Sequence, residues 1–374
     1  MAAPREERIA EQRIEAMLPS FPFYIQEYIR DKRRYGNTPS TQLDYLYDFR
    51  IFFEWLLNEG LSPTSQSISE IPYSILATLR KQDVEFFIDF VRDKPFEVKK
   101  DVWKKRSVTR VIRITQSLKS LFRYLTEETE LENGECYFDR NVMTKIKIGK
   151  TKETAKRRSQ RISTSLLNDQ DIEEFIMFLK NEYEMTLTPR QKAMYMRNKE
   201  RDIALISLML GSGIRVSEAA GLLMSSINHK KNTIDVTRKG GKEDTVLVLP
   251  STMDDLRAYL NVRSERYQPN QQEAFVFLTR YQGKAQQISI RSIEANINQY
   301  TRAFTSGRSM SPHKLRHSFA GGWLRNGGDI VKLRDQLGHS SIETTALYTN
   351  LKDDESISIV ERMDKSRRND QISD

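Results

Sequence analysis

The chain has 374 residues, of which 38% are hydrophobic and 30% are charged. This length suffices for two domains, since a domain takes roughly 100–200 residues, and the composition excludes a largely disordered protein. Lys and Arg number 60 against 51 Asp and Glu, which gives a formal net charge of +9. A polyanion is therefore the first partner to consider, beside an ordinary solvated surface.

The single cysteine, Cys136, excludes an intrachain disulfide and a zinc site built from several cysteines, and it fits a reducing compartment. The N-terminus is charged and lacks the apolar core of a signal peptide. No later segment approaches the ~18 consecutive apolar residues of a membrane span. We therefore expect a cytoplasmic protein without membrane insertion.

Residues 20–130 show the periodicity of a helical bundle. After a charged opening helix, the pattern predicts a second helix over 37–60, a shorter one over 81–93, and a fourth that Ser107 is placed to cap. One side of the fourth helix is apolar. Its opposite side carries the cations Arg106, Arg110, Arg113 and Lys119. Such a row is either a solvated face or a face that follows DNA phosphates.

The segment KIKIGKTKETAKRRSQR, residues 145–161, is strongly basic and lacks apolar periodicity. It contains one acidic residue, Glu153, so we interpret it as a linker between a helical domain over 1–144 and a second domain that begins at 162. The linker is either a plain spacer or a chain that lies along phosphates. Its DNA-binding candidates are Lys150, Lys152, Lys156, Arg157 and Arg158.

Beyond the linker, the sequence predicts a mainly α domain with one small β-hairpin. Apolar residues alternate on both sides of Gly240 and Gly241, which is typical of two strands joined by a glycine-rich turn. Helices are expected over 167–183, 200–213, 251–266, 290–304, 312–326, 329–337 and 341–349. The fold class is therefore mainly α with a small sheet, an α+β domain beside a helical bundle.

No nucleotide, metal or hydrolase motif occurs in the sequence, so we expect neither a cofactor nor a metal. The residues that could do chemistry are mainly cationic. Arg215 stands at a turn before a helix, and Glu218 is three residues on, where it can orient the guanidinium. By itself this pair is most simply a surface ion pair.

The stretch SPHKLRHSF predicts a helix that begins near Pro312 and carries His313 and Arg316 on one face. Backbone N–H groups and the positive end of the helix dipole favour a phosphate there. His317 either reaches the same place or has a structural role.

The stretch LGHSSIETTALYTN, residues 337–350, predicts a helix end at Gly338 and a new helix whose capping residues are Ser340 and Glu343. His339 then lies in the corner between the two helices. Tyr348 lies about 10 Å farther along the new helix, at ~1.5 Å per residue. Taken alone, Tyr348 is most simply a helix-end residue with its hydroxyl in water.

Together, these positions resemble the active-site set of the tyrosine recombinases. The set is Arg215, Lys239 in the hairpin turn, His313, Arg316, His339 and Tyr348. Lys239 follows Arg215 by 24 residues, His339 follows Arg316 by 23, and Tyr348 follows His339 by 9. Six residues in this order leave little room for coincidence. Within the family, the phrases ENGECYFDRNVM and IDVTRKGGK are most similar to the Xer chromosome-dimer resolvases, in particular their single-protein XerS branch.

The resemblance implies that Tyr348 is the nucleophile and forms a 3′-phosphotyrosyl link. Arg215 and Arg316 would neutralise the phosphate oxygens, and His339 would donate a further hydrogen bond to them. His313 would be the general base for the tyrosine, and Lys239 the acid that protonates the leaving 5′-oxygen. Because the covalent link conserves the energy of the phosphodiester, neither ATP nor a metal is needed.

The resemblance also implies an organisation and a set of partners. Residues 1–144 would be a helical core-binding domain that clamps double-stranded DNA, 145–161 the linker, 162–353 the catalytic domain, and 354–374 a tail that docks onto a neighbouring subunit. The protein would dimerise on a dif-type site and form a tetramer at synapsis. A septal DNA translocase of the FtsK type is a further partner to consider.

Three alternatives stay open: the recombinase of a mobile element, a type IB topoisomerase, and a non-catalytic DNA-binding protein with the same fold. The chain also departs from the Xer pattern in two places. Asn350 stands where Xer proteins commonly have His, and Glu243 with Asp244 replaces a basic residue after the hairpin turn. These departures bear on fine placement and subfamily, because they touch none of the six positions.

Overall fold

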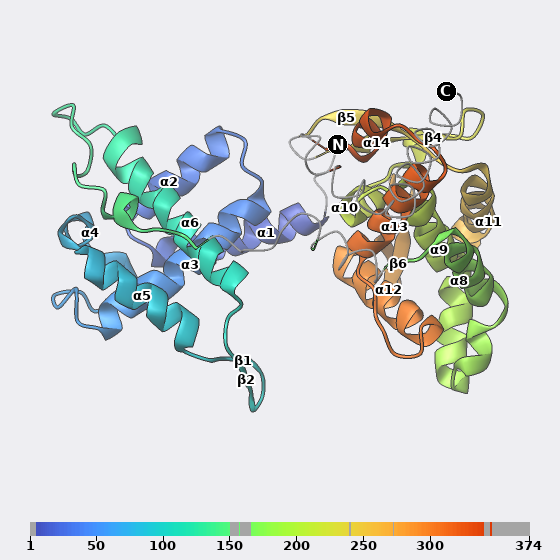
Figure 1. The fold of residues 1–374 in the computed structure, drawn as a ribbon, viewed down its shortest axis with the longest axis horizontal. Coiled ribbons are helices and arrows are strands. Elements are labelled where there is room, and N and C mark those ends of the chain that lie inside the picture. Colours follow the sequence, from blue (N-terminus) through green and yellow to red (C-terminus); the bar gives the residue numbers. More distant parts are fainter. Residues whose placement is uncertain are drawn as a thin grey trace, which may run out of the picture. The chain divides into compact units, whose positions relative to one another are not determined.

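The computed structural model describes residues 5–149, 157, 166–238, 241–271, 273–339 and 345. The chain divides into two compact units, and the boundary between Lys152 and Glu153 falls within the predicted linker (Figure 1). The described residues are mostly helical, with three small antiparallel sheets, which confirms the predicted fold class. None of the helices in the described ranges is long and apolar enough to cross a membrane.

The N-terminal unit is a bundle of helices around an aromatic core. Its α-helices are α1 (Arg5–Met17), α2 (Phe23–Arg34), α3 (Pro39–Asn58), α4 (Tyr73–Thr78), α5 (Lys81–Asp93) and α6 (Val108–Arg123). Short turns of 3-10 helix cover Leu18–Ser20, Ile68–Glu70 and Val142–Lys145, and a π-helical turn covers Tyr124–Glu128. Ser107 caps α6 as predicted, since its hydroxyl accepts the N–H of Arg110 at 3.2 Å.

An antiparallel hairpin that the sequence did not predict connects α5 to α6. Its strands are β1 (Phe96–Lys99) and β2 (Val102–Lys104). The hairpin extends from the helical bundle in Figure 1. The strands are too short to show a clear alternation of apolar and polar residues, which explains why a pattern search misses them.

The C-terminal unit has seven α-helices among its described residues. They are α8 (Asp169–Asn181), α9 (Pro189–Ser212), α10 (Val216–Ala220), α11 (Pro250–Tyr267), α12 (Ile290–Phe304), α13 (Pro312–Arg325) and α14 (Ile330–Leu337), with 3-10 turns at Tyr183–Thr186 and Met224–Ser226. The second half of α9 is buried on every side and packs against α11 and α13. Helix α9 is thus the centre of this unit's core.

The predicted hairpin is present as β4 (Thr233–Thr237) and β5 (Glu243–Leu247), with Ile234 opposite Val246. A short strand, β3 (Ile227–Asn228), extends it to three strands in the order β3-β4-β5. A second hairpin of β6 (Leu278–Tyr281) and β7 (Lys284–Gln287) was not predicted.

Most of the remaining helix predictions differ from the structure by a few residues, but α9 begins at Pro189, well before the predicted start at 200. Ser311 precedes α13, as expected, but its side chain makes no capping hydrogen bond. The helix predicted over 341–349 lies outside the described residues except for Thr345, which is helical and buried.

Gly213 brings three helices together next to Arg215. It ends α9 in the left-handed conformation, with φ +70°. A Cβ atom there would lie 2.4 Å from Cδ1 of Phe319 on α13 and 2.9 Å from Cδ2 of Leu337 on α14. The absence of a side chain therefore lets the ends of α9 and α14 meet α13 closely.

We expect Gly213→Ala to lower the free energy of unfolding of the C-terminal unit by roughly 2–5 kcal/mol. About 1–2 kcal/mol comes from holding alanine in the left-handed backbone conformation. About 1–3 kcal/mol comes from overpacking by the added methyl group. Gly327→Ala is the matched control, since Gly327 also has positive φ (+79°) but nothing lies within 4 Å of its added Cβ. Urea unfolding followed by circular dichroism measures both. An equal loss in the two variants would show that close packing at Gly213 contributes nothing.

Candidate active site

Arg215, which is partly exposed, and the buried Glu218 form an ion pair at the start of α10. The Nη1 atom of Arg215 donates to Glu218 Oε1 at 2.8 Å, and the backbone N–H of Arg215 donates to Oε2 at 2.8 Å. Burial alone would raise the pKa of Glu218, but the Arg215 N–H and the guanidinium groups of Arg238 and Arg215 lower it below its usual value. A charged carboxylate thus fixes the direction of the Arg215 side chain.

Arg316, on α13, is one of the largest fully buried side chains of the described chain, with 1% of its surface exposed. Its Nη1 atom donates to the carbonyl of Gly213 at 2.7 Å, and Nη2 donates to the carbonyl of Leu337. These carbonyls stand at the C-terminal ends of α9 and α14, where unpaired C=O groups and the negative end of the helix dipole stabilise a cation. The two helix ends therefore hold this buried charge.

Arg238, which directly follows β4, is a third arginine of the site; like Arg316 it is buried, and the sequence did not predict it. It donates from Nη1 to Glu218 Oε2 (3.0 Å), from Nε to Asp244 Oδ2 (3.0 Å) and from Nη2 to the carbonyl of Gln336 (2.8 Å). Asp244 is one of the departures from the Xer pattern, and its contact with Arg238 gives it a role. An acid in a place where Xer proteins commonly have a base is the one sequence signal that could have indicated a nearby cation, and it was not used to predict Arg238.

The three arginines converge on the end of α14. Arg238, Arg316 and Arg215 donate to the consecutive carbonyls of Gln336, Leu337 and Gly338, the last at 3.2 Å. Gly338 has φ +62°, and a Cβ atom there would lie 2.6 Å from Nε of Arg238. Residues far apart in the sequence are thus joined at one helix terminus, from which the chain continues to His339.

His313 and His339 are held next to these cations. Partial burial, Arg316 and Arg215 lower the pKa of His313, and its ring lies in an edge contact with His317 at a centroid distance of 4.3 Å. The pKa of His339 is lowered to about 4, mainly by burial and further by the charges of Arg316 and Arg215. Both imidazoles are therefore neutral at neutral pH.

One nitrogen of His339 is engaged by the protein itself. Its Nδ1 atom lies 3.0 Å from the hydroxyl of Thr345, which is fully buried. This contact fixes the ring orientation, as hydrogen bonds to functional histidines commonly do.

Four of the six predicted catalytic residues, Arg215, His313, Arg316 and His339, thus share one electrostatic environment. Lys239 and Tyr348 lie outside the described residues, as do Lys150, Lys152, Lys156 and Arg158. Arg157 is described and exposed. The described residues contain no group of His, Cys, Asp and Glu side chains suited to a metal ion.

The four cations predicted for DNA binding on and before α6 contact their own unit. Arg110 pairs with the buried Asp48 and Arg113 with Asp44, both on α3. Lys119 Nζ donates to the carbonyl of Ile146 at 2.7 Å, and Arg106 donates to the carbonyls of Val91 and Lys94. These contacts hold α6 in the bundle, and a role of these residues on DNA stays a prediction.

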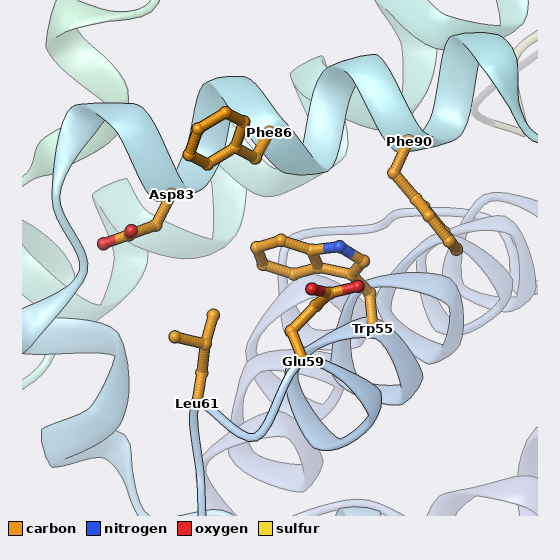
Figure 2. A pocket seen from close by; sticks show the side chains of 6 residues that line it. All are labelled: Trp55, Glu59, Leu61, Asp83, Phe86 and Phe90. Carbon is orange, nitrogen blue, oxygen red and sulfur yellow. The ribbon is translucent and has the colours of Figure 1, made fainter.

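A surface pocket of the N-terminal unit lies between α3 and α5 (Figure 2). Its lining residues are Trp55, Glu59, Leu61, Asp83, Phe86 and Phe90. None of the predicted catalytic or DNA-binding residues belongs to it. Its two carboxylates make it unsuitable for a phosphate.

Comparison with known proteins agrees with this geometry. The model of the phage integrase family matches residues 166–355. The chain is 38% identical over 344 residues to "Tyrosine recombinase XerS" of Streptococcus gordonii, covering 92% of this chain and 96% of that protein. It is 37% identical over 352 residues to the protein of the same name from Streptococcus sanguinis, covering 94% and 98%.

Two solved structures share the fold. One is the XerH site-specific recombinase bound to difH substrate in a pre-cleavage complex, with a TM-score of 0.60, 19% identity, and coverage of 90% of this chain and 83% of that one. The other is a lambda integrase(75-356) dimer bound to a COC' core site, with a TM-score of 0.55, 14% identity, and coverage of 88% and 95%. The family model matches more than half of the chain, and the XerS relatives align with nearly all of it. The chain therefore belongs to the phage integrase family of tyrosine recombinases.

Proposed function

We propose that the chain is a site-specific recombinase that cuts and rejoins double-stranded DNA through a 3′-phosphotyrosyl link at Tyr348. We propose further that it acts in the cytoplasm and resolves chromosome dimers at a dif-type site. The observation that carries the proposal is the convergence of Arg215, Arg316 and His339 on the end of α14. This arrangement is suited to one anionic group.

The guanidinium groups supply the charge that a phosphodiester requires. Its negative charge repels a nucleophile, so catalysis needs positive groups fixed before the reaction begins. The Arg215 side chain keeps 36% of its surface exposed and is open to a phosphate oxygen, while Arg316 contributes its charge from a buried position. Charges held in a poorly hydrated site act more strongly than in water.

The neutral histidines suit the proton transfers. His313 can accept the proton of the Tyr348 hydroxyl, whose ordinary pKa near 10 makes it a poor nucleophile unaided. The tyrosine oxygen then bonds to phosphorus, the bond from phosphorus to the 5′-oxygen breaks, and Lys239 protonates that oxygen. His339 donates a hydrogen bond to the phosphate. The 5′-hydroxyl of a partner strand reverses the reaction and restores the tyrosine.

The proposed partners are DNA and further copies of the chain. Support comes from the net charge of +9 and from two fold neighbours, the XerH recombinase bound to difH and the lambda integrase dimer bound to a core site. We propose a dimer on each site, a tetramer at synapsis through the tail 354–374, and activation by a septal DNA translocase of the FtsK type.

The direct test uses a nicked suicide duplex that carries a dif-type site. We expect the wild-type chain to form a covalent protein–DNA adduct, and Tyr348→Phe to form none because it lacks the attacking oxygen. Tyr281→Phe is the control, since Tyr281 is exposed in β6 of the same unit. The adduct is measured by denaturing gel electrophoresis. Absence of an adduct on every recombination-type site would exclude the proposed reaction.

Arg238 should act on the reaction by positioning Arg215 and the end of α14. We expect Arg238→Gln to slow single-turnover adduct formation roughly 10- to 100-fold with nearly unchanged DNA affinity, because a misplacement of about 1 Å can cost about 100-fold in rate. The defect should shrink on a methylphosphonate substrate, since its neutral phosphorus group needs less positive charge.

Asp244→Asn is the matched control for Arg238→Gln. It removes the charge of the more exposed partner (40% exposed) and leaves the contacts of Arg238 with Glu218 and Gln336. We expect little change in its cleavage rate. Equal defects on the phosphodiester and the methylphosphonate would contradict a positioning role.

The low pKa of His339 should make stability depend on pH. The folded chain protonates His339 only near pH 4 and an unfolded chain near 6.5, so between these values the unfolded state binds more protons. The free energy of unfolding should therefore fall as the pH is lowered from 6.5 towards 4. His339→Gln should reduce this dependence in urea unfolding at about pH 7.5 and about pH 5. The exposed His229, replaced by Gln, serves as control, and the same reduction in both variants would contradict this assignment.

A further inference from the structure

The β1–β2 hairpin exposes an aromatic ring that its own unit does not bury. Trp103, at the centre of β2, has 61% of its surface exposed, and Val102 beside it 43%. Every strand residue of β2 is exposed. A two-stranded hairpin is marginally stable by itself, so a hairpin that leaves its largest apolar side chain in water gains little from folding alone.

The base of the hairpin is nevertheless fixed to α5. The guanidinium of Arg106 lies 5.1 Å from the ring centroid of Phe96 and donates to the carbonyls of Val91 and Lys94. Lys105 lies 3.5 Å from Asp93, also at the end of α5. The hairpin therefore has a defined direction relative to the bundle.

The register of the strands separates the two faces of the hairpin. Phe96 stands opposite Lys104, and Glu97 stands opposite Trp103. Since directly opposed residues share a face, the ring of Trp103 points away from the face on which Arg106 covers Phe96. Glu97 also accepts the N–H of Asp101 at 3.0 Å, and Asp101 has φ +64°, so this carboxylate is used to close the turn.

The surroundings of Trp103 are cationic. Residues 94–106 contain six Lys or Arg and two acidic residues. Phe86 is an equally exposed aromatic residue of the same unit (64%), but Glu59 and Asp83 line the pocket beside it (Figure 2). A polyanion is attracted to the hairpin and repelled from the pocket.

We propose that the β1–β2 hairpin is a ribbon that enters the major groove of the DNA site, with Trp103 against the base edges and Lys100 and Lys104 on the flanking phosphates. This inference rests on the proposed function for the identity of the DNA. The major groove is wide enough for a two-stranded ribbon, and an apolar side chain there can contact thymine methyl groups. A protein partner fits less well, because lysine is depleted in protein interfaces.

The test measures the affinity of the full chain for a labelled dif-type duplex as a function of salt. Trp103→Ala should weaken binding to the site about tenfold, because it removes an apolar contact with the base edges, and should weaken binding to an unrelated duplex less. Trp103→Phe should retain most of the affinity. Replacing Lys100 and Lys104 by Gln should reduce the slope of log affinity against log salt by roughly 2, since each phosphate contact contributes about 0.9.

Phe86→Ala is the matched control, because it removes an aromatic ring of equal exposure from an acidic surface, and it should bind as the wild type does. Unchanged affinity and salt slope in the hairpin variants would overturn the proposal. The proposal would also be overturned if the hairpin variants bound a single half-site normally but no longer bound a full site as two copies. The hairpin would then contact a second copy of the chain instead of DNA. The suicide duplex distinguishes this proposal from the proposed function. If the wild type formed no adduct but Trp103→Ala still bound DNA more weakly, recombination would be refuted and the DNA contact of the hairpin would stand.

Discussion

The site depends on the bonding of three guanidinium groups to three consecutive carbonyls at the end of α14. A buried cation is costly unless it is paired and hydrogen-bonded, and the end of a helix offers carbonyls that have no partner within the helix. Glu218 links the set, since its two oxygens accept from Arg215 and Arg238. None of the three arginines can therefore move without disturbing the others, and the next residue along the chain from these carbonyls is His339.

This concentration of positive charge is stored in the folded chain before DNA is present. The guanidinium groups lower the pKa of both His313 and His339, after the larger effect of burial. A phosphate bound among them would be attracted by the same charges that repel a proton from the imidazoles. In the proposed mechanism the neutral histidines accept a proton or donate a hydrogen bond, while the arginines would provide the electrostatic stabilisation. Such division of roles needs fixed geometry, and the carbonyls of α14 supply it.

The sequence predicted much of the catalytic unit, but it could not reveal contacts between distant segments. The spacing of Arg215 and Glu218 and the start of α13 are local, and both are present in the structure. Arg238 was missed because its partners, Gln336 and Glu218, are far away in the chain, and no local pattern shows that it is buried. For the cations of α6, the sequence predicted the exposed position but not the contacts within the unit. Their spacing indicated an outer face, but Asp44 and Asp48 of α3 engage two of them.

The ends of α9 and α14 show how one backbone feature serves two purposes. Gly213 and Gly338 both end a helix in the left-handed conformation, and the carbonyl of each accepts a hydrogen bond from an arginine of the site. The space above each glycine is filled differently. At Gly213 it is filled by the hydrocarbon side chains of Phe319 and Leu337, and at Gly338 by the guanidinium of Arg238. Glycine is required at the first position for the packing of the core and at the second for the placement of charge. The same way of ending a helix thus joins the stability of the C-terminal unit to the electrostatics of its candidate active site.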